Sequence, residues 1–345
     1  MEYVSGKILT EKGFKDGYIG FEKNKIYKKS KGEPPEKPIA KGLITPSFIN
    51  FHTHLGDSFI RNKNVDLPKD IKKLVAPPDG IKHKLLKKAY QFEIVDGMEE
   101  SIDTMLKTGT KLFYDFRENG IMGICELKTA LRDWKTSGLI LSRPENIEYD
   151  PKEIDLLLKN SDGIGLSSIT DWKYNDIKKI AEKTKKQKKI FSIHASERIR
   201  EDIDKILDLN PDFLIHMNKA TESDLKKVKE KNIPIVICPR SNDFFGMKPN
   251  YKILKKMGIT ILIGTDNAMI NSPNIIDEIK LIKKQTDIFT LHELLKMITI
   301  SPRKVLNPRA SILCSKSPAD LVVIDEKTLD VLYVSKSRYI VRDNA

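Results

Sequence analysis

Cysteine is scarce in this chain of 345 residues, which contains only Cys125, Cys238 and Cys314. The three lie far apart, are odd in number and form no CxxC pair, which argues against a disulfide framework and favours a reducing, cytoplasmic setting. Long apolar runs are also missing, since no segment approaches the roughly 20 residues of a membrane-spanning helix. The first residues lack a basic stretch followed by an apolar core, so we expect no signal peptide. These absences predict a cytoplasmic protein that does not enter a membrane.

Acidic residues are too few to balance the basic ones, and the formal net charge is +13. Lysine runs at residues 185–189 and 226–229 fall on expected helices, where a solvated basic face is the simplest interpretation. Nucleic-acid binding is the alternative. No interleaving of aromatic and basic residues supports that alternative, so we expect no nucleic-acid partner.

Short apolar runs alternate with longer amphipathic segments after residue 46. Eight of these runs are candidate strands: Ser47–His52, Thr110–Asp115, Gly138–Ser142, Gly163–Leu166, Ile190–His194, Phe213–His216, Ile233–Cys238 and Ile259–Gly264. Strands that alternate with helices predict a parallel sheet, and eight such units predict a closed (β/α)8 barrel of the TIM type. A doubly wound open sheet is the alternative, but the first strand has no glycine-rich phosphate turn after it.

The two ends of the chain have a different pattern, because short strands and turns replace the strand–helix alternation. We expect residues 1–45 and 311–345 to form one small β-domain that flanks a barrel of residues 46–310. The segment between the first two barrel strands is too long for a simple crossover. It is interrupted by prolines in its first half and predicts a long helix over Lys84–Leu106 in its second. We expect this segment to cover the functional site.

Histidines gather where the predicted strands end. His52 and His54 are one residue apart on a strand, so their side chains project to the same face. His194 and His216 end two further strands, and Asp266 follows the last one. Because catalytic groups of a (β/α)8 barrel cluster at the carboxyl ends of the strands, these residues should meet. Imidazole and carboxylate groups there predict a metal site.

In this pattern the chain resembles the amidohydrolase superfamily, specifically its mononuclear deaminase and chlorohydrolase branch. The resemblance rests on His-x-His after the first strand, His194 with Glu197 three residues later, His216, and Thr265-Asp266 in that order. Residues 238–242 (Cys-Pro-Arg-Ser-Asn) also look like those of guanine, cytosine and adenosyl-thioether deaminases. The resemblance implies that one Zn²⁺ or Fe²⁺ is bound by a set of four ligands: His52, His54, His194 and Asp266.

The resemblance also implies catalytic roles. Asp266 would accept a proton from the attacking water, Glu197 would shuttle a proton to a ring nitrogen, and His216 would bind the attacking oxygen or orient the substrate. Relatives with two metals use a carbamylated lysine from the fourth strand. That strand ends at Leu166 without a lysine or glutamate, and Lys173 comes too late, so we expect one metal.

Hints about the substrate come from arginines at strand ends. Arg117, Arg143 and Arg240 follow the second, third and seventh strands, and guanidinium groups bind carboxylate or phosphate bidentately. They predict an anionic group on the substrate. The alternative is that they form ion pairs with acidic residues in the loops. Asn242 is a further candidate for the pocket.

Together these observations predict a metal-dependent aminohydrolase, a hydrolase of carbon–nitrogen bonds other than peptide bonds. It would release ammonia from a heterocycle that bears an amidine, such as a purine, pterin or pyrimidine derivative. The alternative enzyme uses the same site to break an amide, ring or carbon–halogen bond. A barrel kept only as a binding scaffold would not need the complete set of ligands and Glu197. The partner is then a small molecule, and a homo-oligomer stays open, because related enzymes often complete their sites across subunits.

Overall fold

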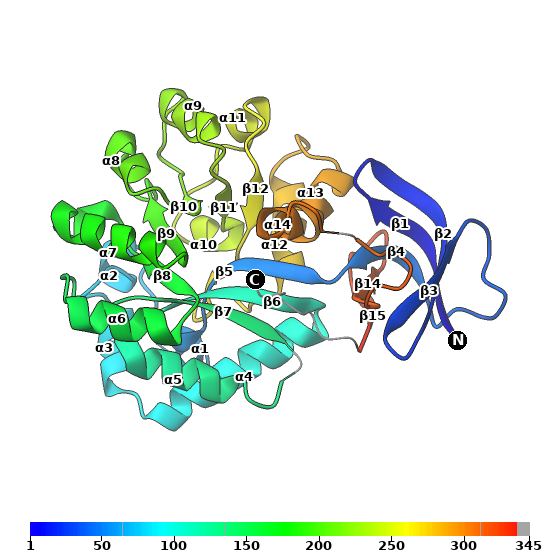
Figure 1. Cartoon of the computed structure of the whole chain (residues 1–345), viewed down its shortest axis with the longest axis horizontal. Coiled ribbons are helices and arrows are strands. Elements are labelled where there is room, and N and C mark those ends of the chain that lie inside the picture. The colour runs from blue at the N-terminus through cyan, green and yellow to red at the C-terminus, as the bar shows by residue number, and fades with distance from the viewer. Residues whose placement is uncertain (64, 135, 311, 337–345) are drawn as a thin grey trace.

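The computed structural model describes residues 1–63, 65–134, 136–310 and 312–336, and it contains two sheets (Figure 1). The smaller, mixed sheet unites the two ends of the chain in the order β15-β14-β4-β1-β2-β3. Its strands are β1 (Glu2–Thr10), β2 (Gly13–Glu22), β3 (Lys25–Ser30), β4 (Ala40–Pro46), β14 (Leu321–Ile324) and β15 (Val331–Val334). The expected flanking β-structure from both termini is confirmed. The domain limits at residues 45 and 311 stay a prediction, and residues 311 and 337–345 lie outside the described residues.

The larger sheet is parallel, and all eight predicted barrel strands are present in it. Its strands are β5 (Phe48–His54), β6 (Thr110–Arg117), β7 (Ser137–Ser142), β8 (Gly163–Leu166), β9 (Ile190–Ala195), β10 (Phe213–His216), β11 (Ile235–Ile237), β12 (Ile261–Ile263) and β13 (Asp266–Asn267). They follow the order β12-β11-β10-β9-β8-β7-β6-β5-β13. Since β13 comes directly after β12 in the chain and pairs with β5, the sheet curls until its first and last strands meet.

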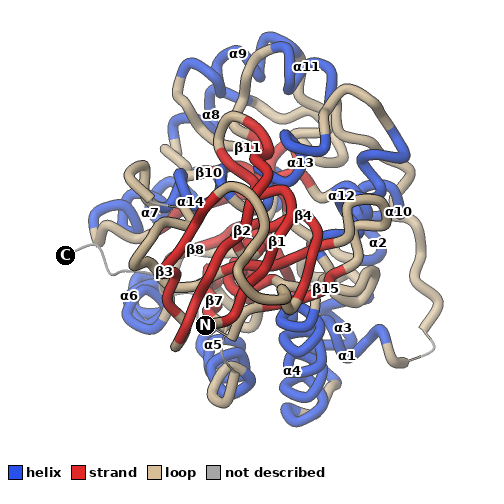
Figure 2. The backbone as a smooth tube through the Cα atoms, turned by 90° about the vertical axis from the view of Figure 1, so that its right-hand side faces the viewer, coloured by secondary structure: helices blue, strands red, loops and turns tan. Residues whose placement is uncertain are grey.

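Helices surround this curled sheet, as Figure 2 shows around the strands. They are α1 (Ser58–Arg61), α2 (Ile71–Leu74), α3 (Ile81–Lys88), α4 (Gln91–Lys107), α5 (Gly120–Ala130), α6 (Pro151–Asn160), α7 (Tyr174–Lys186), α8 (Ile203–Asp208), α9 (Glu222–Glu230), α10 (Pro239–Phe244), α11 (Tyr251–Lys256), α12 (Ile275–Gln285), α13 (Leu291–Ile298) and α14 (Ile300–Leu306). Helix α7 is typical, because Ile177, Ile180 and Ala181 are buried while its lysines face outward. None of the helices among the described residues has the length and apolarity to span a bilayer.

The prediction of one long helix over Lys84–Leu106 is wrong, because the structure has two helices there, α3 and α4. The break falls at Ala89 and Tyr90, both of which have extended backbone. The Glu93 carboxylate accepts a hydrogen bond of 3.0 Å from the Tyr90 backbone N–H and so caps the new helix. No glycine or proline marks this break, and the capping carboxylate is its local cause.

An irregularity in β5 positions the first histidine. Between Asn50 and Thr53 this strand advances three residues while β6 advances two, which is the register shift of a β-bulge. Neighbouring residues therefore need not alternate between faces at this point. Phe51 stacks on Tyr114 inside the barrel with ring centroids 4.2 Å apart, and the next ring, His52, lies 4.4 Å from that of Phe116. The aromatic layer thus forms the floor on which His52 rests.

Candidate metal centre

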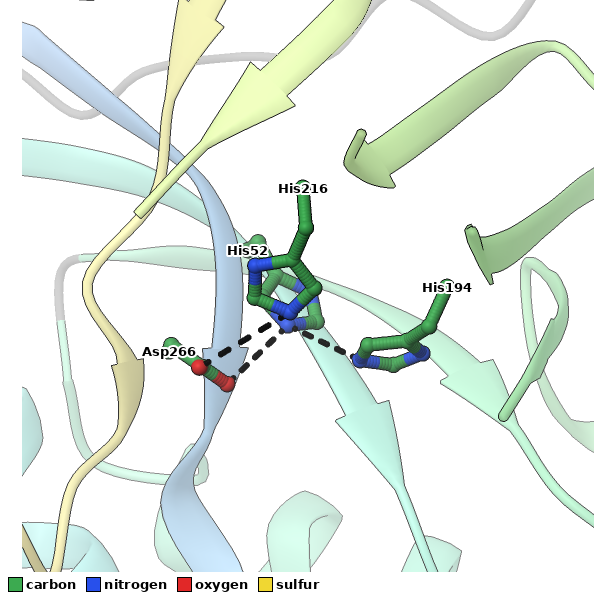
Figure 3. A group of neighbouring side chains, drawn as sticks. All are labelled: His52, His194, His216 and Asp266. Carbon is green, nitrogen blue, oxygen red and sulfur yellow. Dashed lines mark hydrogen bonds and ion pairs between the residues drawn. The ribbon is translucent and has the colours of Figure 1, made fainter. Parts of the chain in front are cut away.

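Five predicted side chains from four strands come together at the carboxyl ends of the sheet. His52 and His54 come from β5, His194 from β9, His216 from β10 and Asp266 from β13. Four of them are drawn in Figure 3, where the imidazoles and the carboxylate point toward one another. One donor atom from each of His52, His194, His216 and Asp266 lies within 4.8 Å of the others. These histidines are up to 164 residues apart in the chain. They meet because the sheet curls.

Distances between the donor atoms match the size of a metal site. His52 Nε2 is 3.2 Å from His194 Nε2 and 3.2 Å from Asp266 Oδ1. His54 Nε2 is 3.4 Å from His194 Nε2 and 3.5 Å from Asp266 Oδ1. Ligands about 2.1 Å from a tetrahedral zinc are about 3.4 Å from one another. These donor atoms are thus spaced as the corners of such a polyhedron would be.

Backbone carbonyl groups orient two of the rings. His54 Nδ1 lies 3.0 Å from the Phe116 carbonyl oxygen, and His194 Nδ1 lies 2.8 Å from that of Leu166. A carbonyl oxygen only accepts, so each Nδ1 carries the proton and each Nε2 keeps its lone pair for the centre. Burial lowers the pKa of His54 to about 4 and that of His194 well below its ordinary value. Both rings are neutral near pH 7, which is the form that binds a cation.

His216 is held in a different way. The Asn242 side-chain Nδ2 lies 3.3 Å from His216 Nδ1 and donates to it, which leaves the proton of this ring on Nε2. His216 Nε2 lies 3.4 Å from Glu197 Oε1 and 4.0 Å from Asp266 Oδ2. Its Nε2 is therefore a hydrogen-bond donor that faces two carboxylates. Burial lowers the pKa of His216 to about 3, so this ring is also neutral.

The two carboxylates at the centre have different surroundings. Asp266 accepts a hydrogen bond of 2.5 Å from the Ser241 hydroxyl at Oδ2 and one of 3.0 Å from the Asn267 amide at Oδ1. Glu197 has 17% of its side chain exposed, and its Oε1 faces His216 Nε2. Burial, and then the charge of Asp266, raises the pKa of Glu197 well above its usual range. Carboxylates whose environments differ in this way suit different proton-transfer roles.

Both groups open into a pocket of about 710 Å³, a size that suits a drug-sized ligand. His54, Glu197, His216 and Asp266 line one side of it. The lining also includes residues of the segment between β5 and α4, among them Ile71, Val75 and Pro77. That this long segment covers the site stays a prediction. We call residues 55–90 the cover segment.

The three arginines predicted to bind the substrate have different surroundings. Arg117 is fully buried, with Nη2 2.8 Å from Glu118 Oε2 and Nη1 3.5 Å from Asp115 Oδ1. Arg240 donates from Nε to Glu278 Oε1 at 2.6 Å and from Nη2 to the Ser272 carbonyl. Neither belongs to the pocket lining. Arg117 therefore forms a loop ion pair of the kind that was the alternative, whereas the carboxylate that Arg240 contacts, Glu278, belongs to helix α12 and not to a loop.

Arg143 does line the pocket. Its Nη2 is 3.9 Å from Glu118 Oε1, which is a long ion pair, and 12% of its side chain is exposed. Asn242 does not line the pocket, and its amide instead contacts His216. At the end of β8 the pocket is lined by Ser167 and Ser168.

Two residues that the sequence did not single out complete the site. Glu118 Oε1 lies 2.8 Å from His54 Nδ1, and the Lys82 ammonium lies 2.6 Å from the same oxygen. Glu118 directly follows β6, and its place just after a strand end is the sequence signal that could have found it. Lys82 is one lysine of a lysine-rich helix, and no sequence feature separates it from its exposed neighbours.

The model of the amidohydrolase family matches residues 43–343, so the chain belongs to that family. The expected enzyme class, a hydrolase of carbon–nitrogen bonds, agrees with this membership. An uncharacterised protein of Methanocaldococcus jannaschii is 37% identical over 286 residues, covering 77% of this chain and 74% of its own. A 5-methylthioadenosine/S-adenosylhomocysteine deaminase of Caldicellulosiruptor saccharolyticus is 26% identical over 328 residues, covering 85% of this chain and 74% of its own.

Solved structures confirm the fold. An atrazine chlorohydrolase of Arthrobacter aurescens complexed with zinc superposes with a TM-score of 0.72 at 14% identity, covering 94% of this chain and 87% of its own. A guanine deaminase of C. acetobutylicum with bound guanine gives 0.66 at 17% identity, covering 94% of this chain and 90% of its own. At such identities the likeness shows the architecture, and the chemistry has to come from the side chains.

Proposed function

We propose that this protein is a metal-dependent aminohydrolase that releases ammonia from a heterocycle bearing an amidine. The proposal rests on one observation. Glu197, His216 and Asp266 lie close together in the lining of the pocket, beside the other imidazoles. The relatives named as deaminases support it.

His52, His54, His194 and Asp266 would hold a zinc or iron(II) ion. The donor set fits, because His54 and His194 direct unprotonated Nε2 atoms to the centre and Asp266 Oδ1 lies 3.2 Å from His52 Nε2. Three imidazoles and one carboxylate suit either metal. His216 is set apart from the ligands by the donation from Asn242, which leaves a proton on its Nε2. When bound, such an ion would lower the pKa of a water molecule and make hydroxide available near pH 7.

Glu197 would supply the proton that makes the heterocycle reactive. The carbon of an amidine accepts hydroxide more readily once its adjacent ring nitrogen is protonated. Burial and the charge of Asp266 raise the pKa of Glu197, which favours its protonated form, and Glu197 lines the pocket. It can give that proton to the ring nitrogen and take one back from the attacking water.

Asp266 and His216 would complete the transfer. Asp266 Oδ2, already bound by the Ser241 hydroxyl, can accept the second proton of the water and pass it to the departing amino group. The carbon–nitrogen bond then breaks, ammonia leaves, and a carbonyl remains on the ring. His216 Nε2–H would hydrogen-bond the attacking oxygen as negative charge develops on it.

We further propose that the substrate carries an anionic group that Arg143 binds. Its guanidinium lines the pocket and has only a long ion pair, whereas Arg117 and Arg240 are held by carboxylates. Lys72, Lys73 and Lys84 line the cover side of the same pocket and add positive charge. A carboxylate or phosphate would balance that charge.

A screen for ammonia release tests the proposed function. Protein loaded with zinc or iron(II) should release ammonia from at least one purine, pterin or pyrimidine that bears an amidine, including anionic derivatives. Protein treated with a chelator should release none, and metal added back should restore the reaction. Chloride or an amide-cleavage product without ammonia would instead identify the alternative hydrolase. Metal-loaded protein that forms neither ammonia nor one of these alternative products would contradict the proposal.

A further inference from the structure

We propose that Lys82 is a positioning residue, which reaches from the cover segment and fixes the orientation of both His54 and Asp266. This inference rests on the proposed function, since it takes both residues as metal ligands. It assigns to the cover segment a part in building the centre, in addition to its part in lining the pocket.

The Lys82 side chain ends in a buried cage of oxygen atoms. Its Nζ lies 2.6 Å from Glu118 Oε1 and 3.2 Å from Asp57 Oδ2, and it donates a hydrogen bond of 3.0 Å to Asn267 Oδ1. Only 2% of this residue is exposed. Three oxygen atoms thus surround the ammonium, although the contact with Asp57 Oδ2 is an ion pair without a hydrogen bond. The Lys82 side chain also lines the pocket.

One arm of the cage leads to His54. The oxygen of Glu118 that Lys82 contacts is the same oxygen that lies 2.8 Å from His54 Nδ1. A carboxylate that receives the proton of a ligating histidine fixes the tautomer and the direction of the ring. The Lys82 ammonium, 2.6 Å from this oxygen, also compensates the negative charge of the buried carboxylate and so holds it beside His54.

The second arm leads to Asp266. Asn267 Oδ1 accepts a hydrogen bond from the Lys82 ammonium, and Asn267 Nδ2 donates one of 3.0 Å to Asp266 Oδ1. The Lys82 hydrogen bond therefore determines which way the Asn267 amide faces. If that amide turned over, its oxygen would confront the Asp266 carboxylate and repel it.

Asp57 ties the same cage to the closing edge of the barrel. Its Oδ1 accepts a hydrogen bond of 2.9 Å from the Met269 backbone N–H, while Oδ2 faces Lys82. Helix α3, which carries Lys82, is thereby connected to the beginning and the end of the sheet. Movement of α3 away from the sheet would take Lys82 from the buried carboxylates of Glu118 and Asp57, which is costly.

Substitution of Lys82 by methionine tests the inference, with Lys87→Met as the matched control. Lys87 lies on the same helix but is exposed and does not line the pocket. Zinc affinity, measured by chelator competition, should fall about 10- to 100-fold in K82M and stay at the wild-type value in K87M. Limited trypsin digestion should cut K82M faster than K87M within residues 63–88.

Asn267→Ala is a second variant, in case K82M does not fold as judged by circular dichroism. It removes only the arm to Asp266 and should lower zinc affinity about tenfold while digestion of the cover segment stays unchanged. If K82M folds and binds zinc as tightly as the wild type, the role of Lys82 is overturned. If K82M is unfolded, wild-type zinc affinity in N267A overturns it instead. Wild-type protein that binds no zinc would instead refute the metal centre of the proposed function, so the two failures are distinguishable.

Discussion

The two ends of strand β5 are held by different kinds of contact. At its carboxyl end, His54 meets Glu118 and Lys82 beside an open pocket. At the opposite end, Arg303 donates to the Ser47 carbonyl and hydroxyl at 2.8 and 2.9 Å, and to Asp320 Oδ2 at 2.6 Å, which ties helix α14 to β5 and to the small sheet. Both ends contain buried charge, and the pocket of about 710 Å³ found among the described residues opens at the first. The comparison teaches that burial of charge identifies a functional site only where a cavity accompanies it.

The largest expected effect separates chemistry from stability at the pocket end. Glu197→Gln removes the proton shuttle and should lower kcat for ammonia release by at least about 100-fold. The bound metal should stay stoichiometric, because Glu197 is not a proposed ligand, and metal analysis checks this. A variant with more than half of the wild-type kcat would remove Glu197 from the mechanism.

The opposite end should behave in the reverse way. Arg303→Met leaves Asp320 without this partner and should lower the free energy of unfolding by about 3 kcal/mol in a denaturant titration. The activity of the folded protein should not change. Lys304→Met is the control, since its ion pair with Glu11 is exposed and should contribute less than about 1 kcal/mol. A catalytic loss in R303M would break the comparison.

A smaller effect is expected where the two proposed ligands on β5 and β13 approach each other. A Cβ atom added at Gly264 would lie 2.5 Å from the His52 Cβ and 2.8 Å from its backbone oxygen, so one of the strands has to shift. Gly264→Ala should therefore weaken zinc binding about tenfold, measured by chelator competition. Gly246→Ala is a control for general destabilisation, because its φ of +69° strains an alanine while nothing lies within 4 Å of the added Cβ, and it should leave zinc affinity at the wild-type value. Equal zinc affinity in G264A and wild type would show that His52 tolerates the shift.

The smallest effect concerns the substrate. Arg143→Met should raise KM for an anionic substrate about tenfold and leave KM for its uncharged analogue nearly unchanged. Steady-state kinetics on the pair provides the measurement. Equal increases for both substrates would assign Arg143 a structural role like that of Arg117.

Much of this arrangement could be predicted from local sequence patterns. The apolar runs located all eight strands, and the rule that catalytic groups follow strand ends selected His52, His54, His194 and Asp266, which the structure brings together. The partners of charged residues could not be predicted in the same way. Arg240 pairs with Glu278, a residue of helix α12 far along the chain, and Lys82 looks like any solvated lysine of α3. Such pairs depend on tertiary packing, which no short pattern encodes.

The closing of the sheet also sets the order in which the centre can form during synthesis. The Asn50 amide donates to the Thr265 hydroxyl across 215 residues of sequence, and Asp266 follows directly. A ribosome adds about 5–20 residues per second, so both histidines of β5 exist for many seconds before their carboxylate partner is made. Contacts of such long sequence separation also make folding slow. The nascent chain therefore presents a histidine pair without its carboxylate, and the complete donor set appears only after most of the protein has left the ribosome.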